Sequence, residues 1–321
     1  MTKAKKDGLS VGQSERNSLI ELYRFILSIN VLMSHGLFIY NGPYFGSGRE
    51  SVEFFFILSG YFFASYLKKH GCEHLIKDTF KMLIDKVRPI FVPLAVGIGS
   101  NLVYSLICGK YRPWGYLWYV RAMLICFVFY FILNKYLKNT KIFLSIVAII
   151  GFVTMGLKFF TQLYPNGHIR AFSAISLGIL LYYLPRIKLK RKWPIICALT
   201  VVGAVCLAIL MLHLGDIRYH GILWVEIILD VLLYPALIYL TLMVRVRNPI
   251  FNYLGALSFG IYAFQCPADL LRLVGYNNTV VLFILILALA VGADLIKGVA
   301  KSKSKSLPKL GGKEGKYESK A

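Results

Sequence analysis

The chain has 321 residues, of which 57% are hydrophobic and 16% charged, and its mean hydropathy is +0.63. A soluble fold of this length would have to bury more apolar surface than its volume allows, so the composition excludes ordinary soluble domains and indicates a membrane protein. The formal net charge of +22 would suggest nucleic-acid binding in a soluble protein, but the basic residues here lie between apolar runs, and we expect no nucleic-acid partner.

Long apolar runs recur along the whole sequence. A helix needs roughly 20 such residues to cross the hydrocarbon core of a bilayer. Ten runs of this kind predict an all-α, polytopic membrane protein with spans at approximately 18–40, 52–67, 89–108, 116–134, 142–160, 169–185, 194–213, 221–243, 254–271 and 279–297.

The distribution of Lys and Arg predicts which side of the membrane each loop faces. Ten spans put both termini on one side, and if that side is the cytoplasm, its segments hold 28 of the 37 basic residues. The outer loops then hold seven, among them Lys158 and Arg170. Because this bias follows the positive-inside rule, we expect a multi-pass protein of the plasma (inner) membrane with cytoplasmic N- and C-termini.

Three parts of the chain differ in character. Residues 1–17 are expected to form a short cytoplasmic segment, residues 18–299 hold all the spans, and residues 300–321 form a basic tail rich in Lys, Ser and Gly. The tail has almost no apolar content, so it is predicted to be disordered. The six cysteines fall mostly in apolar runs without metal-ligand spacing, and no metal site is expected.

The first span carries two ionisable residues, Arg24 and His35, which are costly in lipid and therefore mark a candidate site. At about 100° per residue they lie within ~20° of the same helix face and ~16 Å apart along its axis, Arg24 toward the cytoplasm and His35 toward the outside. Imidazole suits general base catalysis near neutral pH, and guanidinium suits phosphate or a polarised carbonyl. The alternatives are that Arg24 snorkels to the inner headgroups beside Glu21 and that His35 only marks the outer interface.

Glu53 opens the second span, in the segment SVEFFFILSGYFF, on the same side of the membrane as His35. A short connection rich in turn-forming residues joins the two spans, so the carboxylate is predicted to meet the imidazole, orient it and raise its basicity. The alternative is a carboxylate that only stabilises the start of its helix. Ser59 and Gly60, further along this span, are interpreted as residues for close helix packing.

Two basic residues, Lys86 and Arg88, stand at the cytoplasmic start of the third span, beside Pro89 and Pro93. Proline starts or bends a helix, and basic groups beside a disturbed helix are suited to holding a phosphorylated donor. Anchoring of the span by positive-inside charge is an equally good explanation.

The fourth span begins with Trp118 and Tyr119, which are typical of an interfacial aromatic belt, and continues to Arg121. Arg121 lies deeper and needs a partner. Glu226 and Asp230, four residues apart on the eighth span, are its predicted partners in a structural ion pair.

These motifs resemble the acyltransferase-3 family of membrane acyltransferases. The similarity lies in Arg24 and His35 with ten residues between them, and in the segment EFFFILSGYFF at residues 53–63. Trp118 and Tyr119 at the head of the fourth span also fit the family pattern.

A late stretch of the form S-x-x-I-Y, from Ser258 to Tyr262, extends the resemblance to the ninth span. The family often carries a histidine after this stretch, where the present chain has Gln265. The similarity therefore covers the whole region of ten spans, with one departure at that position.

The resemblance implies a membrane-bound O-acyltransferase that takes an acyl group, usually acetyl, from cytoplasmic acyl-CoA to a hydroxyl of an extracytoplasmic or lipid-linked glycan. It implies acyl-CoA as a donor substrate and no permanently bound cofactor. By the same similarity His35 is the catalytic histidine, and Arg24, Lys86 and Arg88 lie on the donor side. The expected partners are acyl-CoA, the glycan acceptor, membrane lipids and polysaccharide-assembly proteins.

Two other functions fit the spans and the intramembrane charges. One is a transporter or flippase for a lipid-linked glycan, a class that often has internal repeats or paired broken helices, and no such repeat is visible in the sequence. The other is a non-catalytic partner in polysaccharide assembly, which would not need Arg24 and His35 on one helix face. The sequence also leaves open whether transfer is direct or passes through an acyl-histidine.

Overall fold

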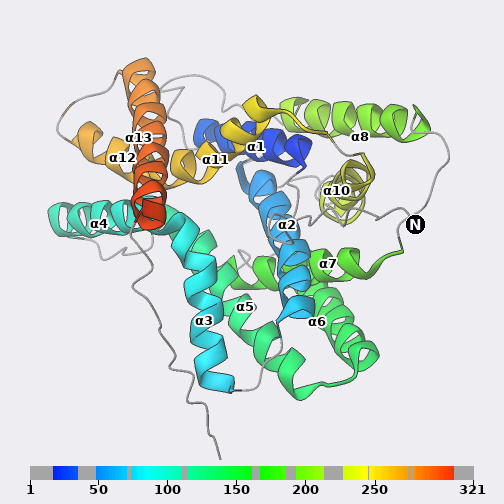
Figure 1. Ribbon diagram of the computed structural model, residues 1–321. Helices are drawn as coiled ribbons and strands as arrows, with labels where there is room; N and C mark the ends of the chain where they lie inside the picture. The colour runs from blue at the N-terminus through cyan, green and yellow to red at the C-terminus, as the bar shows by residue number, and fades with distance from the viewer. Residues whose placement is uncertain are drawn as a thin grey trace, which may run out of the picture.

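The computed structural model of the protein describes an all-helical chain (Figure 1). Two residues considered above, His35 and Glu226, lie outside the described part. No strand occurs within that part, which comprises residues 17–34, 48–70, 74–109, 115–160, 167–185, 193–212, 227–244, 246–273, 275 and 278–306.

Helices follow one another along the chain, and η3 is a π-helix. Their bounds are α1 Ser18–Ser34, α2 Gly48–Lys69, α3 Leu75–Val87, η1 Arg88–Ile90, α4 Phe91–Cys108, η2 Gly115–Leu117, α5 Trp118–Tyr136, α6 Thr140–Phe160, α7 Gly167–Tyr183, α8 Trp193–Leu212, η3 Ile228–Leu233, α10 Tyr234–Met243, α11 Pro249–Ala263, α12 Gln265–Leu273 and α13 Thr279–Ser306.

An additional helix precedes the third predicted span. Much of the segment between the second and third predicted spans forms this helix, α3. The chain then turns through η1 into α4, and the two helices point in clearly different directions (Figure 1). Pro89 and Pro93 lack the backbone N–H groups that would continue a straight helix, which accounts for the turn at this point.

Two further boundaries differ from the prediction. The ninth span is divided at Phe264 into α11 and α12, because Pro267 has no N–H to donate to the carbonyl of Ala263. α13 continues to Ser306, so the expected disordered tail from residue 300 begins with helical residues. Extension of an existing helix avoids the cost of nucleation, which explains why these polar residues remain helical.

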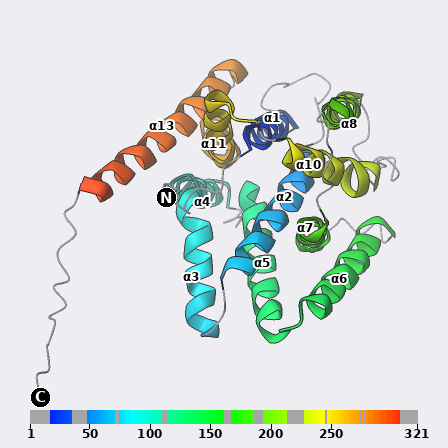
Figure 2. The ribbon, with the colours of Figure 1, turned by 45° about the vertical axis from the view of Figure 1, so that its right-hand side comes forward.

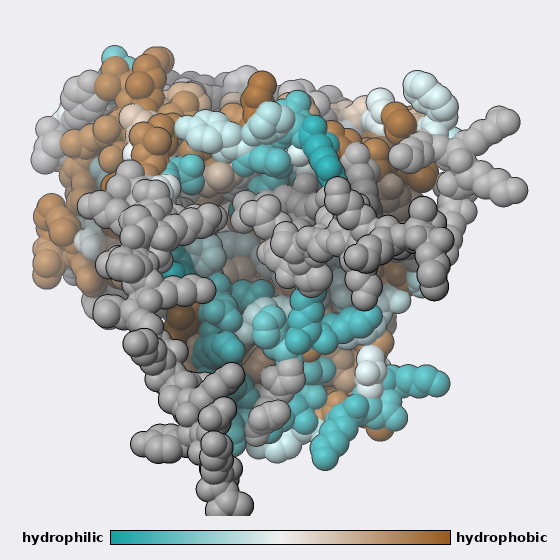
Figure 3. All heavy atoms as spheres, in the orientation of Figure 1, coloured by the Kyte–Doolittle hydropathy of each residue, from teal (hydrophilic) through white to brown (hydrophobic). Residues whose placement is uncertain are grey.

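Three helical segments are long and apolar enough to cross a membrane by length and composition within the described residues: Leu75–Cys108, Trp118–Tyr136 and Thr140–Phe159. Large hydrophobic side chains are exposed on α4, α6, α8 and α13. Figure 3 shows hydrophobic residues gathered over α4, α12 and α13 at the upper left of the molecule. An apolar surface of this extent is the lipid-facing surface of a membrane protein.

Glycine residues allow the central helices to approach closely. A Cβ atom at Gly60 of α2 would lie 2.3 Å from the carbonyl oxygen of Ile175, and one at Gly178 of α7 would lie 1.9 Å from that of Ile57. The predicted packing role of Gly60 is therefore confirmed. Small residues let transmembrane backbones meet in this way, and the crossing fixes α2 against α7.

Polar contacts tie together helix ends that are far apart in sequence. The Asn17 amide donates to the carbonyl oxygens of Thr241 and Val244, at 2.6 Å each, and the backbone N–H of Asn248 donates to Ser18 Oγ at 2.7 Å. The start of α1, the end of α10 and the start of α11 therefore lie side by side. The alternation of spans predicted from the sequence requires these three ends to share one side of the membrane.

Candidate functional site

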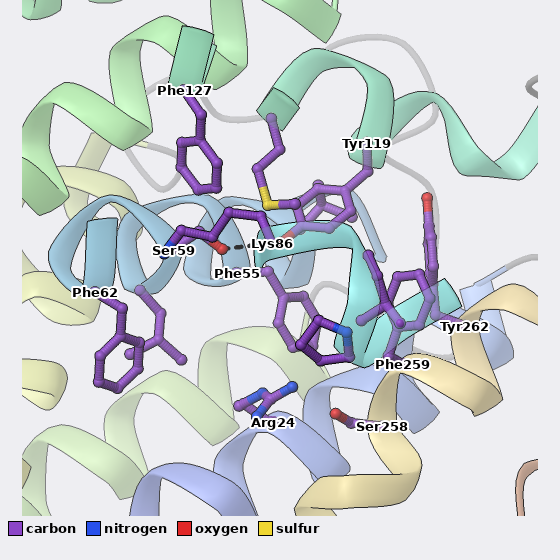
Figure 4. Close-up of a pocket in the computed structure, with 15 residues that line it drawn as sticks. Arg24, Phe55, Ser59, Phe62, Lys86, Tyr119, Phe127, Ser258, Phe259 and Tyr262 are labelled. Atoms are coloured by element: carbon purple, nitrogen blue, oxygen red, sulfur yellow. Dashed lines mark hydrogen bonds between the residues drawn. The ribbon is translucent and has the colours of Figure 1, made fainter. Parts of the chain in front are cut away.

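A cavity of about 340 Å³ lies among α1, α2, α3, α5 and α11. Most of its lining is aromatic or aliphatic, and the cations Arg24 and Lys86 reach it from different helices (Figure 4). Its lining also includes four hydroxyl-bearing residues: Ser59, Tyr119, Ser258 and Tyr262. Such a mixture of apolar walls and a few polar groups is typical of small-molecule sites.

The cavity follows one face of α2. Val52, Phe55, Ser59 and Phe62 all line it, at positions i, i+3, i+7 and i+10 of the helix. The distance from the first to the last is ~15 Å along the helix axis, at about 1.5 Å per residue. The cavity is therefore an elongated space that covers about half the thickness of a bilayer core.

Arg24 projects from α1 into this space (Figure 4). Its Nη1 donates to Glu21 Oε2 at 2.8 Å, and its side chain is half-buried, whereas Glu21 is buried. Gly255 of α11 makes room for this carboxylate, because a Cβ there would lie 2.2 Å from Glu21 Oε2. The contact with Glu21 fixes the guanidinium at the cavity wall.

Lys86 lines the cavity and is surrounded by aromatic side chains. Its Nζ lies 4.5 Å from the ring centroid of Tyr66, 5.6 Å from that of Phe63 and 5.7 Å from that of Phe127. No carboxylate forms an ion pair with it among the described residues. Cation–π contacts hold the ammonium group without neutralising its charge, so it remains able to attract an anion. Arg88, predicted to act beside it, is exposed and does not line the cavity.

Tyr119 is part of the site, which corrects its interpretation as an interfacial belt residue. Its side chain is buried, and its hydroxyl lies 3.2 Å from Ser59 Oγ across the cavity wall (Figure 4). Ser59, predicted only as a packing residue, thereby gains a polar role. Hydroxyl groups in an apolar pocket can donate to a carbonyl oxygen and fix its orientation.

A separate ion network is formed by Glu53, Lys158, Arg170 and Asp230, all of them at most 6% exposed. Glu53 Oε1 accepts from Lys158 Nζ at 2.9 Å and from Arg170 Nε at 2.6 Å, and Lys158 also pairs with Asp230. Two cations thus meet two carboxylates. Buried charges persist in a membrane protein when they are paired in this manner.

The ion network corrects two predictions. Lys158 and Arg170 were assigned to outer loops, but they lie in the last turn of α6 and the first turn of α7, both buried. Asp230 was predicted to pair with Arg121, but it pairs with Lys158, while Arg121 is exposed and lies 3.5 Å from His168 Nε2. A buried ammonium group is costly without a carboxylate partner, whereas an arginine that reaches the surface is solvated there.

The role predicted for Glu53 concerns a residue that the structure does not describe. His35 directly follows Ser34, the end of α1, and a Cβ at Gly48 of α2 would lie 1.9 Å from Ser34 Oγ. The end of α1 therefore lies beside the start of α2, five residues before Glu53. Glu53 Oε1 accepts from both Lys158 and Arg170, and the sequence did not predict these two contacts.

One signal for the ion network was present in the sequence. Lys158 stands in the apolar stretch TMGLKFF, where an unpaired ammonium group would be costly, so a buried carboxylate was required elsewhere.

Gln265, the departure from the family pattern, is buried, and neither of its side-chain amide atoms has a hydrogen-bond partner among the described residues. It does not line the cavity.

The family model described as an acyltransferase domain, Acyl_transf_3, matches residues 17–296, which is most of the chain. The chain belongs to the acyltransferase-3 family. No curated protein and no solved structure matches it significantly. As a member of this family it is an acyltransferase, and together with the long apolar helices this makes it a membrane enzyme.

Within this acyltransferase, the cavity and the ion network differ in what they offer chemically. The cavity has space, two cations and several hydroxyl groups, whereas the ion network is packed and its charges are paired. The cavity is therefore the candidate site for binding an acyl donor.

Proposed function

We propose that the protein is a multi-pass enzyme of the plasma membrane that transfers an acyl group, with acetyl the expected one, from cytoplasmic acyl-CoA. The acceptor is a hydroxyl of an extracytoplasmic or lipid-linked glycan. The proposal includes a topology of ten membrane spans with both termini in the cytoplasm. Two kinds of observation support it: the way helix ends are grouped, and the position of the cavity.

The grouping of helix ends supports the proposed topology. Residues assigned to the cytoplasmic side meet one another, as Asn17 meets Val244, and as the Tyr239 hydroxyl donates to the Pro185 carbonyl oxygen at 2.5 Å. Residues assigned to the outer side also meet, as Glu53 meets both Lys158 and Arg170. An error of one span would place some of these partners on opposite sides of the membrane.

The single observation that carries the proposal is the elongated cavity with a cation at its cytoplasmic part. Lys86 lies before the third span, where its ammonium group can attract the phosphates of CoA. The apolar walls along α2 suit a pantetheine arm, whose thioester then reaches Ser59 and Tyr119. The ~15 Å length of the cavity along α2 is close to the ~16 Å that the sequence predicts between Arg24 and His35 along the first span.

In the proposed reaction His35 is the general base. It accepts the proton of the glycan hydroxyl as the hydroxyl oxygen bonds to the thioester carbonyl carbon, the carbon–sulfur bond breaks, and the proton passes to the CoA thiolate. Arg24 polarises or positions the donor carbonyl. Because Glu53 Oε1 is engaged by two cations, we assign Glu53 to the ion network and do not propose it as the partner of His35.

The test is mass spectrometry of surface glycans from a deletion strain complemented with the native protein or with His35→Ala. We expect the variant to insert into the membrane but to transfer no acyl group. His70→Ala, at the exposed end of α2, is the matched control and is expected to restore acylation. Normal acylation by His35→Ala would reject the chemistry, and lost glycan translocation with acylation intact would favour a flippase.

A further inference from the structure

One side of α3 is an apolar stripe that faces away from the protein. Ile76, Phe80 and Ile84 are 74%, 62% and 61% exposed, although they belong to a well-formed helix. They follow one another at intervals of four residues and so cover an arc of about 80° on the helix surface. Residues of this size are not left in water at such spacing without a partner surface.

This stripe continues the apolar surface of the next helix. Phe91, at the start of α4, is 61% exposed, and Leu106 and Ile107 near its end are also exposed. On its other side α3 packs against α5, where Lys86 Nζ lies 5.7 Å from the ring centroid of Phe127. Both ribbon views place α3 at the edge of the molecule (Figure 2). The stripe is thus continuous with the lipid-facing surface and is not covered by the described helices.

Basic side chains flank the stripe. Lys77 and Lys81 are exposed and lie on neighbouring turns of α3, at about 100° from Ile76 and Phe80, respectively. The two acidic residues of the helix have partners within the protein. Asp78 Oδ2 accepts the backbone N–H of His74 at 2.8 Å, and Asp85 Oδ2 accepts the Tyr66 hydroxyl at 3.2 Å. Both donors are neutral, so the two carboxylates keep their charges, and Lys77 and Lys81 are the basic groups next to the stripe.

We propose that α3 lies along the membrane surface as an interfacial helix, with its apolar stripe at the boundary of the acyl chains and Lys77 and Lys81 against anionic lipid headgroups. An exposed apolar face with flanking lysines is the pattern of helices that bind anionic membrane surfaces. The assignment of this surface to the cytoplasmic leaflet rests on the proposed function, whereas lipid contact by itself does not.

This position gives the membrane a part in building the donor site. Lys86 lies about 120° around the helix from Phe80, so it faces the cavity when the stripe faces lipid. Pro89 and Ile90, just after α3, also line the cavity. Lipid contact along α3 therefore holds one wall of the cavity in place, and Lys86 acts at the end of a membrane-bound helix.

The test places the photoreactive residue p-benzoylphenylalanine at position 80 of the full-length protein, in vesicles of phosphatidylcholine with about one quarter phosphatidylglycerol. After irradiation, mass spectrometry identifies what is joined to the residue. The matched control is position 85, on the exposed polar side of α3. We expect lipid adducts at position 80 at roughly fivefold the yield at position 85. Crosslinks to a second copy of the chain, or equal yields at both positions, would overturn the proposal.

A second experiment tests the role of the two lysines, which are exposed, so their substitution leaves the packed core unchanged. With the native lysines, vesicles containing phosphatidylglycerol should give more lipid adducts at position 80 than vesicles of pure phosphatidylcholine, by roughly fivefold per lysine at most. The double variant Lys77→Gln/Lys81→Gln is expected to give equal yields in the two kinds of vesicle. An unchanged gain would overturn the role of the headgroups. Lipid adducts at position 80 in a protein that transfers no acyl group from CoA would leave this inference standing while rejecting the proposed function.

Discussion

The ion network and the cavity both contain charged side chains inside the protein, but they differ in how completely those charges are paired. In the ion network two cations and two carboxylates lie in contact, and the groups are almost inaccessible. In the cavity, Arg24 has one carboxylate partner, and Lys86 lies against aromatic rings with no carboxylate at ion-pair distance among the described residues. Paired charges hold helices together, whereas incompletely paired ones next to open space are available to a ligand.

Breaking the ion network is expected to have the largest effect. Glu53→Gln leaves Lys158 and Arg170 with a single carboxylate between them, and an uncompensated buried charge costs about 3–5 kcal/mol. We expect a loss of folded protein, measured as the monodisperse fraction and the melting temperature in detergent. Asp85→Asn, at an exposed carboxylate, is the control and should behave as the native protein.

A double variant sharpens this result. Glu53→Gln/Arg170→Gln restores charge balance and is expected to recover part of the lost stability. If Glu53→Gln alone has a native melting temperature, the ion network does not hold the fold together, and the contrast between the two regions fails.

The helix crossing that supports the ion network should be the next most sensitive. Gly178→Ala places a methyl group where the Ile57 carbonyl oxygen already lies, and overpacking of this kind costs about 1–3 kcal/mol. Gly99→Ala is the matched control, because nothing lies within 4 Å of the added atom. Melting temperatures of the two variants give the comparison, and equal values would show that α2 and α7 do not depend on their close approach.

In the cavity, a charge can be removed without destabilising the fold. Lys86→Met keeps an unbranched side chain among the aromatic rings but loses the ammonium group, so the KM for acyl-CoA should rise about tenfold with kcat little changed. The melting temperature should stay close to that of the native protein. Arg88→Met, which changes an exposed residue outside the cavity lining, is the control in the same steady-state assay. Equal effects of the two variants would mean that cytoplasmic charge in general, and not the cavity, attracts the donor.

The smallest effect is expected from the hydroxyl pair. Ser59→Ala removes the hydrogen bond to Tyr119 and should cost about 0.5–1.5 kcal/mol in transition-state stabilisation or stability. Ser100→Ala is the control, because among the described residues that hydroxyl bonds to the Val96 carbonyl of its own helix alone. A Ser59→Ala enzyme with native kcat/KM and melting temperature would remove Ser59 from the site.

Apolar length and charge position made much of the fold predictable. The runs that became α5 and α6 were found almost to the residue, because lipid exposure demands continuous hydrophobicity. α3 was missed because its apolar residues are spaced along one side and do not form a run. The division at Phe264 was missed because a single proline inside a hydrophobic stretch does not change its hydropathy.

The site was predictable in its cations but not in its partners. Arg24 and Lys86 stood out as charges at a membrane and both reach the cavity. The pairing of Lys158 with Asp230 depends on how α6 meets η3, and no spacing along the sequence encodes contacts between distant helices. The sequence favours a belt position for Tyr119, because the end of a span gives no sign of whether a side chain faces lipid or a neighbouring helix, and the residue is in fact buried.

The central claim, that the cavity receives the acyl donor, is tested most directly by photolabelling with an acyl-CoA that carries a diazirine in its acyl group. After irradiation of the purified native enzyme, labelled residues are mapped by mass spectrometry, with unlabelled acyl-CoA as competitor. We predict competable adducts on the cavity faces of α2 and α5, between Phe55 and Phe62 and between Tyr119 and Met123. Competable adducts confined to other helices would contradict the account.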